Sequence, residues 1–200
     1  MKIDNIGSVT HGVTLSRIQA KSYDDFDTYK VFTMQDLSHE TGQYSIKEEI
    51  QKANICKNKF DSSFLSKINM VVIGLTSYKA MVIDETHKEK LITSNFAIVE
   101  FDESKIDPFY FTWYFNEHPQ IQKQLAIAMQ GTIIRALSIQ MLRELEVPLP
   151  PLDVQMKIGK VYKLRKTKEK LLFERNILEN EFYKHLIINK LKEDIKNVSK

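Results

Sequence analysis

Cysteine and glycine are scarce in this sequence of 200 residues, and both shortages narrow its possible functions. The single cysteine, Cys56, cannot form a disulfide within the chain, which fits a protein of the reducing cytoplasm. No two of the six glycines are close enough for a glycine-rich loop around a nucleotide or methyl donor. The five histidines lack the spacing of a metal site, so we expect neither a cofactor nor a bound metal.

Long hydrophobic runs are also missing. The longest, at about 70–75, is far shorter than the roughly 18–20 apolar residues that a membrane-spanning helix needs. Residues 1–5 are polar and have no signal-peptide core. The sequence therefore predicts a chain without a membrane span, large enough for one medium domain or one domain plus an appendage.

Charge is unevenly distributed along the chain, whose formal net charge is +3. Residues 150–200 hold 13 Lys and Arg against 7 Asp and Glu, which leaves 16 basic and 19 acidic residues in 1–149. The N-terminal part is thus not a uniformly basic surface for DNA. Any contact of this part with nucleic acid must therefore be made by a local group of basic or polar side chains.

Three prolines, Pro148, Pro150 and Pro151, divide the sequence into two parts. Prolines this dense are incompatible with a helix or a central strand and predict a stiff, extended connector. Residues 153–195 contain no proline and one glycine, Gly159, and predict a helix of about 65 Å with Asp153 as its N-cap. We therefore expect a domain over 1–149 and a helical segment over 150–200.

The predicted C-terminal helix is amphipathic, because its apolar residues recur at spacings of three and four. A long helix with one apolar face needs a partner, so we expect a coiled-coil contact. Packing against the chain's own domain is the alternative, but a straight helix of this length would extend past a domain of about 150 residues. The residues predicted to contact the partner helix are Ile158, Val161, Leu171, Leu172, Leu178, Phe182 and Leu186.

Residues 1–149 are predicted to form an α+β domain with a mixed β-sheet and short helices. Strands are expected at 29–34, 70–75, 80–83 and 97–101, where β-branched and aromatic residues lie between polar turns. Helices are expected at 109–115 and 119–129. The second begins with Pro119 and carries Ile121, Leu125 and Met129 one turn apart.

Three charged residues have the types and order found in the active site of a metal-dependent nuclease. In such an enzyme two carboxylates, here Asp84 and Glu103, hold a metal ion and a lysine, here Lys105, lies beside the attacked phosphate. This chemistry requires Glu103 and Lys105 to lie on a strand. Their surroundings, 102–108, instead predict a polar turn before a helix, so solvent exposure is the favoured interpretation.

A distinctive passage surrounds the proline connector. It consists of Gln130-Gly131-Thr132, a short helix ending at Leu142, then Pro148-Leu149-Pro150-Pro151-Leu152 and Gln155-x-x-Ile158. The opening at 6–9 with Gly12, the strand at 70–75 and the stretches 93–98 and 106–110 add weaker similarity. Together these residues resemble the specificity subunits of type I restriction-modification systems, in which a target-recognition domain runs into a conserved spacer helix.

The resemblance implies a non-catalytic subunit that recognises double-stranded DNA. It would recruit a methyltransferase subunit, which holds the methyl donor, and through it a restriction subunit. A standard subunit of this family has two target domains and two spacer helices, whereas this sequence has one of each. We interpret it as a half-subunit, natural or a fragment, whose helix gains an antiparallel partner from a second copy, so that a homodimer reads a split palindromic site.

Four polar loops carry side chains suited to reading base edges, and the resemblance implies that such loops face the DNA. The loop around Gly131 is the best candidate, because glycine lets the backbone approach a phosphate closely. The predicted DNA-contacting residues are Arg17, Lys21, Ser77, Tyr78, Lys79, Ser94, Asn95, Gln130, Gly131, Thr132 and Arg135.

Three points stay open at the level of sequence. The basic segment 163–170 either contacts phosphates or forms a solvated or partner-facing side of the helix, and the second interpretation is favoured. The near-neutral N-terminal domain is also compatible with a coiled-coil adaptor that binds protein and not DNA. A small nuclease built on Asp84, Glu103 and Lys105 is a third possible function.

Overall fold

The computed structural model describes the backbone of all residues except 41, 43–49, 131–135 and 199–200, and the side chains of the same residues except 39, 40 and 193–198. Its elements are η1 (Ile3–Asn5), β1 (Gly7–His11), α1 (Leu15–Ile18), β2 (Phe26–Lys30), α2 (Met34–Glu40), β3 (Lys52–Cys56), η2 (Lys57–Lys59), η3 (Ser62–Phe64), β4 (Val71–Gly74), β5 (Lys79–Val82), β6 (Phe96–Phe101), α3 (Pro108–Glu117), α4 (Pro119–Ala128), α5 (Ile139–Glu144) and α6 (Leu152–Val198).

Two sheets form the domain, and the predicted α+β class is confirmed. A four-stranded sheet has the order β1-β6-β4-β5, with every neighbouring pair antiparallel, and β2 pairs antiparallel with β3. Among the described residues, parallel pairing occurs in the isolated bridges from Val13 to Thr93 and from Val31 to Leu91. Since β1 and β4 both run antiparallel to β6, their C-terminal ends lie beside the N-terminal end of β6.

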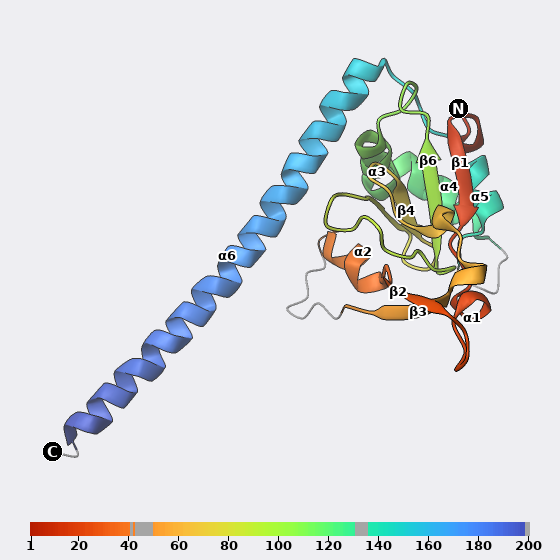
Figure 1. Cartoon of the computed structure of the whole chain (residues 1–200). Helices are drawn as coiled ribbons and strands as arrows, with labels where there is room; N and C mark the ends of the chain where they lie inside the picture. Colours follow the sequence, from red (N-terminus) through yellow and green to blue (C-terminus); the bar gives the residue numbers. More distant parts are fainter. Residues whose placement is uncertain (41, 43–49, 131–135, 199–200) are drawn as a thin grey trace.

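The four-stranded sheet is buried on both faces, which explains why β4 is an uninterrupted apolar run. Val71 and Ile73 join the core that α3, α4 and α5 form on one face. Val72 lies on the other face in a core with Phe32 and with Leu37 of α2. Figure 1 shows this layering, with α2 on the opposite side of the sheet from α3.

Several predicted elements are confirmed and one strand is wrong in part. The strands near 70–75, 80–83 and 97–101 and the helices near 109–115 and 119–129 are present within one or two residues of their predicted bounds. The strand expected at 29–34 instead ends at Lys30, and α2 begins at Met34. The reason is a reciprocal cap, in which the Thr33 N–H donates to Asp36 Oδ2 and the Asp36 N–H donates to Thr33 Oγ1.

The long helix α6 begins at Leu152, one residue earlier than predicted, directly after the proline connector. Asp153 therefore lies in the first turn and not at the N-cap, and it pairs with Lys157 at 3.1 Å. At 47 residues the helix is about 70 Å long. Among the described residues, no helix combines the length and apolar character that crossing a bilayer requires.

Gln155 fastens the start of α6 to the domain. Its side chain is buried, and its Oε1 accepts a hydrogen bond from the Asp107 N–H at 3.1 Å. Its Nε2 donates to the carbonyl oxygens of Lys105 at 3.1 Å and Pro150 at 2.8 Å. One amide thus joins the turn before α3, the proline connector and α6, and leaving its partners unpaired would cost about 1–3 kcal/mol each.

A second buried amide, that of Asn116 in α3, connects α6 to the edge of the sheet. Its Oδ1 accepts from the Ala80 N–H at 2.9 Å and its Nδ2 donates to the Ala80 carbonyl oxygen at 2.8 Å, so the side chain pairs with β5 as another strand would. The same Nδ2 lies 3.0 Å from the Tyr162 hydroxyl. Burial raises the pKa of Tyr162, which keeps this hydroxyl protonated.

Between these two anchors, Gly159 allows α6 to lie directly against the N-terminus of α3. A Cβ atom at this position would lie 2.2 Å from Asp107 Oδ1 and 3.0 Å from Phe109 Cβ. Asp107 cannot easily move, because its Oδ1 caps α3 by accepting from the Tyr110 N–H at 2.7 Å. The single glycine of the predicted helix is therefore a packing residue.

We expect Gly159→Ala to destabilise the protein by about 1–3 kcal/mol, because the added methyl group forces α6 away from α3. Helix propensity alone would favour the substitution by about 1 kcal/mol, so the two effects have opposite signs. Urea unfolding measures the difference, with the exposed neighbour Lys160→Ala as the matched control. A Gly159→Ala protein as stable as the wild type would refute this account of the packing.

Candidate nucleic-acid interface

Segments that adjoin the four predicted reading loops meet at one end of the four-stranded sheet. The Leu75 N–H donates to the Asn95 carbonyl oxygen at 3.1 Å, and the Leu137 N–H donates to the Leu75 carbonyl oxygen at 2.9 Å. The Ser94 N–H donates to the Val13 carbonyl oxygen at 2.8 Å. Backbone hydrogen bonds thus connect the segment after β1, the β4–β5 turn, the approach to β6 and the segment before α5.

The β4–β5 turn presents Lys79 at this end. Tyr78 adopts a left-handed backbone conformation with φ of 55°, and its N–H donates to the Gly74 carbonyl oxygen at 3.0 Å to close the turn. Lys79 is exposed and Tyr78 is half-buried. The Ser77 hydroxyl oxygen is buried and has no hydrogen-bond partner within the described part of the chain. Lys79 is therefore more accessible to DNA than Ser77.

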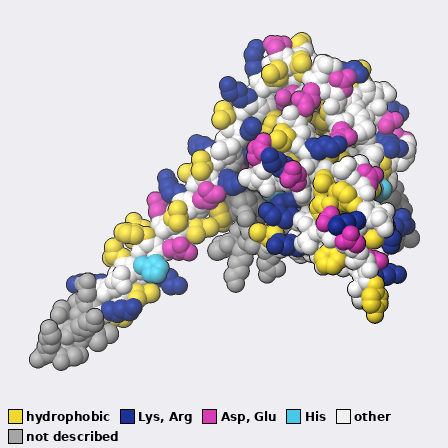
Figure 2. All heavy atoms as spheres, in the orientation of Figure 1, with side chains coloured by type: hydrophobic (Ala, Val, Ile, Leu, Met, Phe, Trp, Pro, Cys, Tyr) yellow, Lys and Arg dark blue, Asp and Glu magenta, His cyan; other side chains and the backbone are white. Residues whose placement is uncertain are grey.

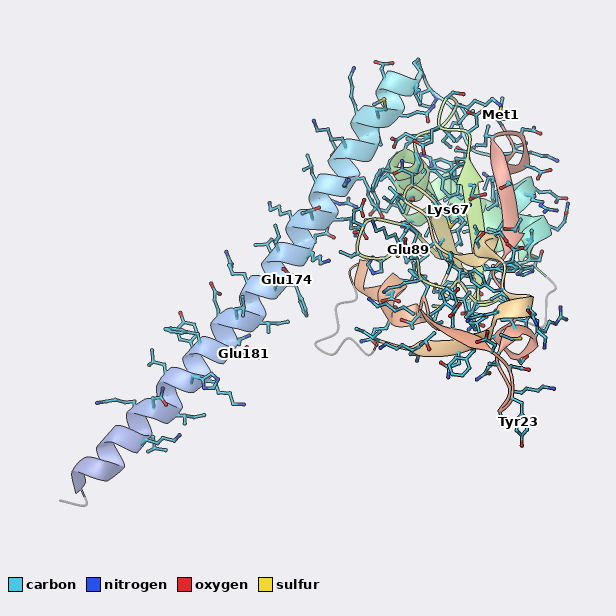
Figure 3. All side chains as sticks on the ribbon, in the orientation of Figure 1. Met1, Tyr23, Lys67, Glu89, Glu174 and Glu181 are labelled. Atoms are coloured by element: carbon cyan, nitrogen blue, oxygen red, sulfur yellow. The ribbon has the colours of Figure 1, made fainter. Side chains whose placement is uncertain are left out.

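Arg17 and Lys21 lie on the segment after β1, and both are exposed. Lys21 begins a turn that is closed by hydrogen bonds from its N–H to Asp24 Oδ2 at 2.8 Å and from the Asp24 N–H to its carbonyl oxygen at 3.0 Å. Tyr23 in this turn is fully exposed and points away from the domain (Figure 3). Sequence reasoning missed Tyr23, for which the one signal is an aromatic residue inside a polar turn.

The remaining predicted contacts are divided between described and undescribed residues. Asn95 and Gln130 are exposed, and Ser94 is half-buried. Gly131, Thr132 and Arg135 lie outside the described residues. The roles of all these residues in DNA binding stay predictions.

Asp84, Glu103 and Lys105, the residues of the possible nuclease site, do not form a metal site in the structure. Residues 103–105 form the predicted turn, in which Lys105 pairs with Asp102 at 2.9 Å. Glu103 accepts from Asn69 Nδ2 at 3.1 Å. A hydrogen bond with His87, at 2.9 Å, holds the pKa of Asp84 well below its usual value. Across the described residues, no group of three or more His, Cys, Asp or Glu side chains could hold a metal ion.

Beyond its contact with α3, helix α6 leaves the domain and exposes apolar side chains (Figures 1 and 2). Of the predicted partner-facing residues, Ile158 is half-buried at the edge of the core and Val161 is exposed. The others, which lie further along the helix, are 44–65% exposed: Leu171, Leu172, Leu178, Phe182 and Leu186. Such a row of exposed apolar side chains is typical of a helix that packs against a partner.

Part of the basic segment 163–170 faces the domain. Lys163 Nζ lies 4.6 Å from the centre of the Phe109 ring. Lys166 is partly buried and pairs with Glu169 at 2.9 Å. Arg165 pairs with Glu117 at the end of α3. Lys163, Arg165 and Lys166 thus make contacts within the chain, and whether the segment binds phosphates stays a prediction.

Comparison with known proteins identifies the family of this chain. A model of the type I restriction modification DNA specificity domain matches residues 1–164. Since the match covers most of the chain, the chain belongs to this family, and the predicted resemblance is confirmed. The matched region ends inside α6, so it includes the part of the helix that docks on α3. Comparison with curated proteins gives no match.

Solved structures share the fold. One comes from work on complex assembly and conformational transition of the type I R-M system, with 14% identity and a TM-score of 0.55 over 90% of this chain and 45% of that chain. The HsdS subunit from Thermoanaerobacter tengcongensis has 13% identity and a TM-score of 0.54 over 88% of this chain and 39% of that chain. The S subunit from M. genitalium has 11% identity and a TM-score of 0.53 over 90% of this chain and 41% of that chain. This chain thus spans less than half of each.

We expect Lys79→Ala to weaken DNA binding roughly threefold to tenfold and to lower its salt dependence by about one counterion, because an exposed lysine at the converging loops would contact phosphate. Filter binding at several salt concentrations, with the methyltransferase present, measures both. Lys105→Ala, at the opposite end of the sheet, is the matched control and should bind as the wild type does. Equal weakening by both substitutions would contradict the location of the interface.

Proposed function

We propose that the chain is the reading subunit of a type I restriction-modification complex, in which residues 1–149 recognise one half-site of double-stranded DNA. The observation that carries this proposal is that segments adjoining the four polar loops meet at one end of the sheet, in a chain of the DNA specificity family. The loops come from different parts of the sequence, so together they can present a surface wide enough to contact several bases.

Residues 150–200 then act as the spacer that positions this reading surface. The connector and the start of α6 lie at the end of the sheet opposite the converging loops (Figure 1). Gln155 and the Asn116–Tyr162 contact hold the helix at one angle to the domain. A spacer held in this way fixes the distance between two half-sites, because helix length and direction are then constant.

Methyl transfer belongs, in this proposal, to a separate methyltransferase subunit that binds the methyl donor. The chain recruits that subunit and, through it, a restriction subunit, without chemistry of its own. Family membership supports this assignment, and so does the engagement of Asp84, Glu103 and Lys105 in separate local contacts.

The direct experiment is retention of DNA fragments by the chain together with its methyltransferase, in the presence of excess unrelated DNA. The proposal expects one bipartite sequence to be retained specifically. A coiled-coil adaptor would give no DNA affinity at all. A small nuclease would cut DNA without the methyltransferase when a divalent metal is added. Either result would overturn the proposal.

A homodimer completes the proposed reading unit, because the exposed apolar side chains of α6 need a partner helix. Light scattering at micromolar concentration should give twice the chain mass of 23.4 kDa. Leu178→Asp combined with Phe182→Asp should give the single mass, because both charges fall in the contact. Asn180→Asp, an exposed polar position on the same helix, is the control. A wild-type protein of 23.4 kDa under these conditions would exclude the dimer.

A further inference from the structure

The turn that carries Tyr23 is held on both sides, by β3 and by Lys57, the residue after it. Before the turn, the Ala20 N–H donates to the Asn54 carbonyl oxygen at 2.9 Å. After the turn, the Lys57 N–H donates to the Asp25 carbonyl oxygen at 3.1 Å, and the Lys57 ammonium group pairs with the Asp25 carboxylate at 3.1 Å. Together with the two hydrogen bonds that close the turn, these contacts fix the backbone that carries the tyrosine side chain.

The ring of Tyr23 is not covered by any of the described residues. Tyr23 is 101% exposed, whereas no other large hydrophobic residue in the described part of the chain exceeds 68%. It projects from the domain at the end that lies away from Met1 (Figure 3). A ring so exposed contributes nothing to the core and keeps two apolar faces in water, so any stabilising contact that it makes is with another molecule.

The charges of the turn indicate which part of DNA the ring fits. Residues 21–25 hold one basic residue, Lys21, and two acidic residues, Asp24 and Asp25. Because Asp25 is paired with Lys57, Asp24 is the unneutralised carboxylate next to the ring. A carboxylate repels the phosphate backbone, whereas the faces of the bases carry no formal charge and stack on aromatic rings. The bases of DNA therefore fit this ring better than its phosphates do.

The faces of paired bases are covered by their neighbours in a duplex, so a ring reaches them only by opening a base step. Proteins open such steps with apolar side chains that act as wedges and kink the duplex. Pyrimidine–purine steps such as TA and CA are the easiest to open, because they are the most flexible. A ring on a fixed turn can therefore distinguish one step from another without reading the edges of its bases.

We propose that Tyr23 is a wedge that enters the DNA at a pyrimidine–purine step of the half-site. The inference rests on the proposed DNA-reading function and adds a specificity-determining residue to it. The step is selected by the ease with which it opens, while the polar loops select bases by their edges. In this arrangement the exposed Arg17 and Lys21, which precede Tyr23 on the same segment, contact the phosphates beside the opened step.

Truncation of the ring tests the wedge on the DNA fragment that the wild type retains together with its methyltransferase. Tyr23→Ala should bind this fragment about tenfold more weakly with an unchanged salt dependence, because the lost contact is to bases and not to phosphate. Tyr23→Phe should bind as the wild type does, since it keeps both faces of the ring. Ile68→Ala, which removes an exposed apolar side chain at the opposite end of the sheet, is the matched control and should leave binding unchanged.

Fluorescence of 2-aminopurine, placed in turn at each adenine of the fragment, detects an opened step, because this base brightens when it loses its stacking neighbours. One position should brighten with the wild type and with Tyr23→Phe and stay dark with Tyr23→Ala. Replacing the step at that position by a stiff AA step should weaken binding of the wild type more than binding of Tyr23→Ala.

Equal binding by Tyr23→Ala and the wild type would overturn the wedge, as would the absence of a position that brightens only when the ring is present. A lower salt dependence of Tyr23→Ala would show a phosphate contact in its place. Loss of the methyltransferase from Tyr23→Ala in size-exclusion chromatography would show that the ring contacts protein and not DNA. Each of these results leaves the proposed DNA-reading function standing, whereas a wild type that retains no specific fragment would overturn that function and the wedge with it.

Discussion

The buried amide of Gln155 determines where α6 starts and in which direction it leaves the domain. Its three hydrogen bonds reach Lys105 in the turn before α3, the N-cap residue Asp107 and the connector, so none of these segments can move without breaking one of them. Gly159 and Tyr162 follow on the same side of the helix, one and two turns later. The geometry of the reading unit depends on these three residues.

This anchor also separates the parts of the chain to which the two proposed functions are assigned. The sheet is covered on both faces, so its strands offer contact surfaces at their ends and not on their faces. One end carries the polar loops, and the other carries the connector and the start of α6. In the proposed dimer, DNA and a partner helix are therefore bound at separate places, and a change in the angle of α6 would alter the spacing of half-sites without altering the bases that are read.

Much of this architecture could be predicted from local sequence patterns. Three prolines and a long amphipathic stretch are enough to predict the connector and α6. The apolar run at 70–75 is enough to predict a buried strand. The α2 helix escaped prediction because Thr33, which forms its cap with Asp36, lies in the stretch 29–34, whose composition also suits a strand. Its helical start is decided by two short polar side chains and not by hydrophobic spacing.

The assembly of the site could not be predicted in the same way. Leu75, Asn95 and Leu137 meet through the strand order β1-β6-β4-β5, which no local pattern encodes. For the same reason the sequence marked Gln155 as part of a motif but did not indicate that it binds Asp107 and Lys105, about 50 residues away. Tyr23 was missed because an exposed aromatic residue in a turn has no periodicity.

We propose that two identical domains, spaced by α6, read the two halves of one DNA site. Mapping methylated positions across the genome of cells with and without this gene tests it most directly. The account predicts that loss of the gene abolishes methylation at one bipartite motif whose two halves are inverted copies of each other. An unchanged methylation pattern, or the loss of a motif with two unrelated halves, would contradict it.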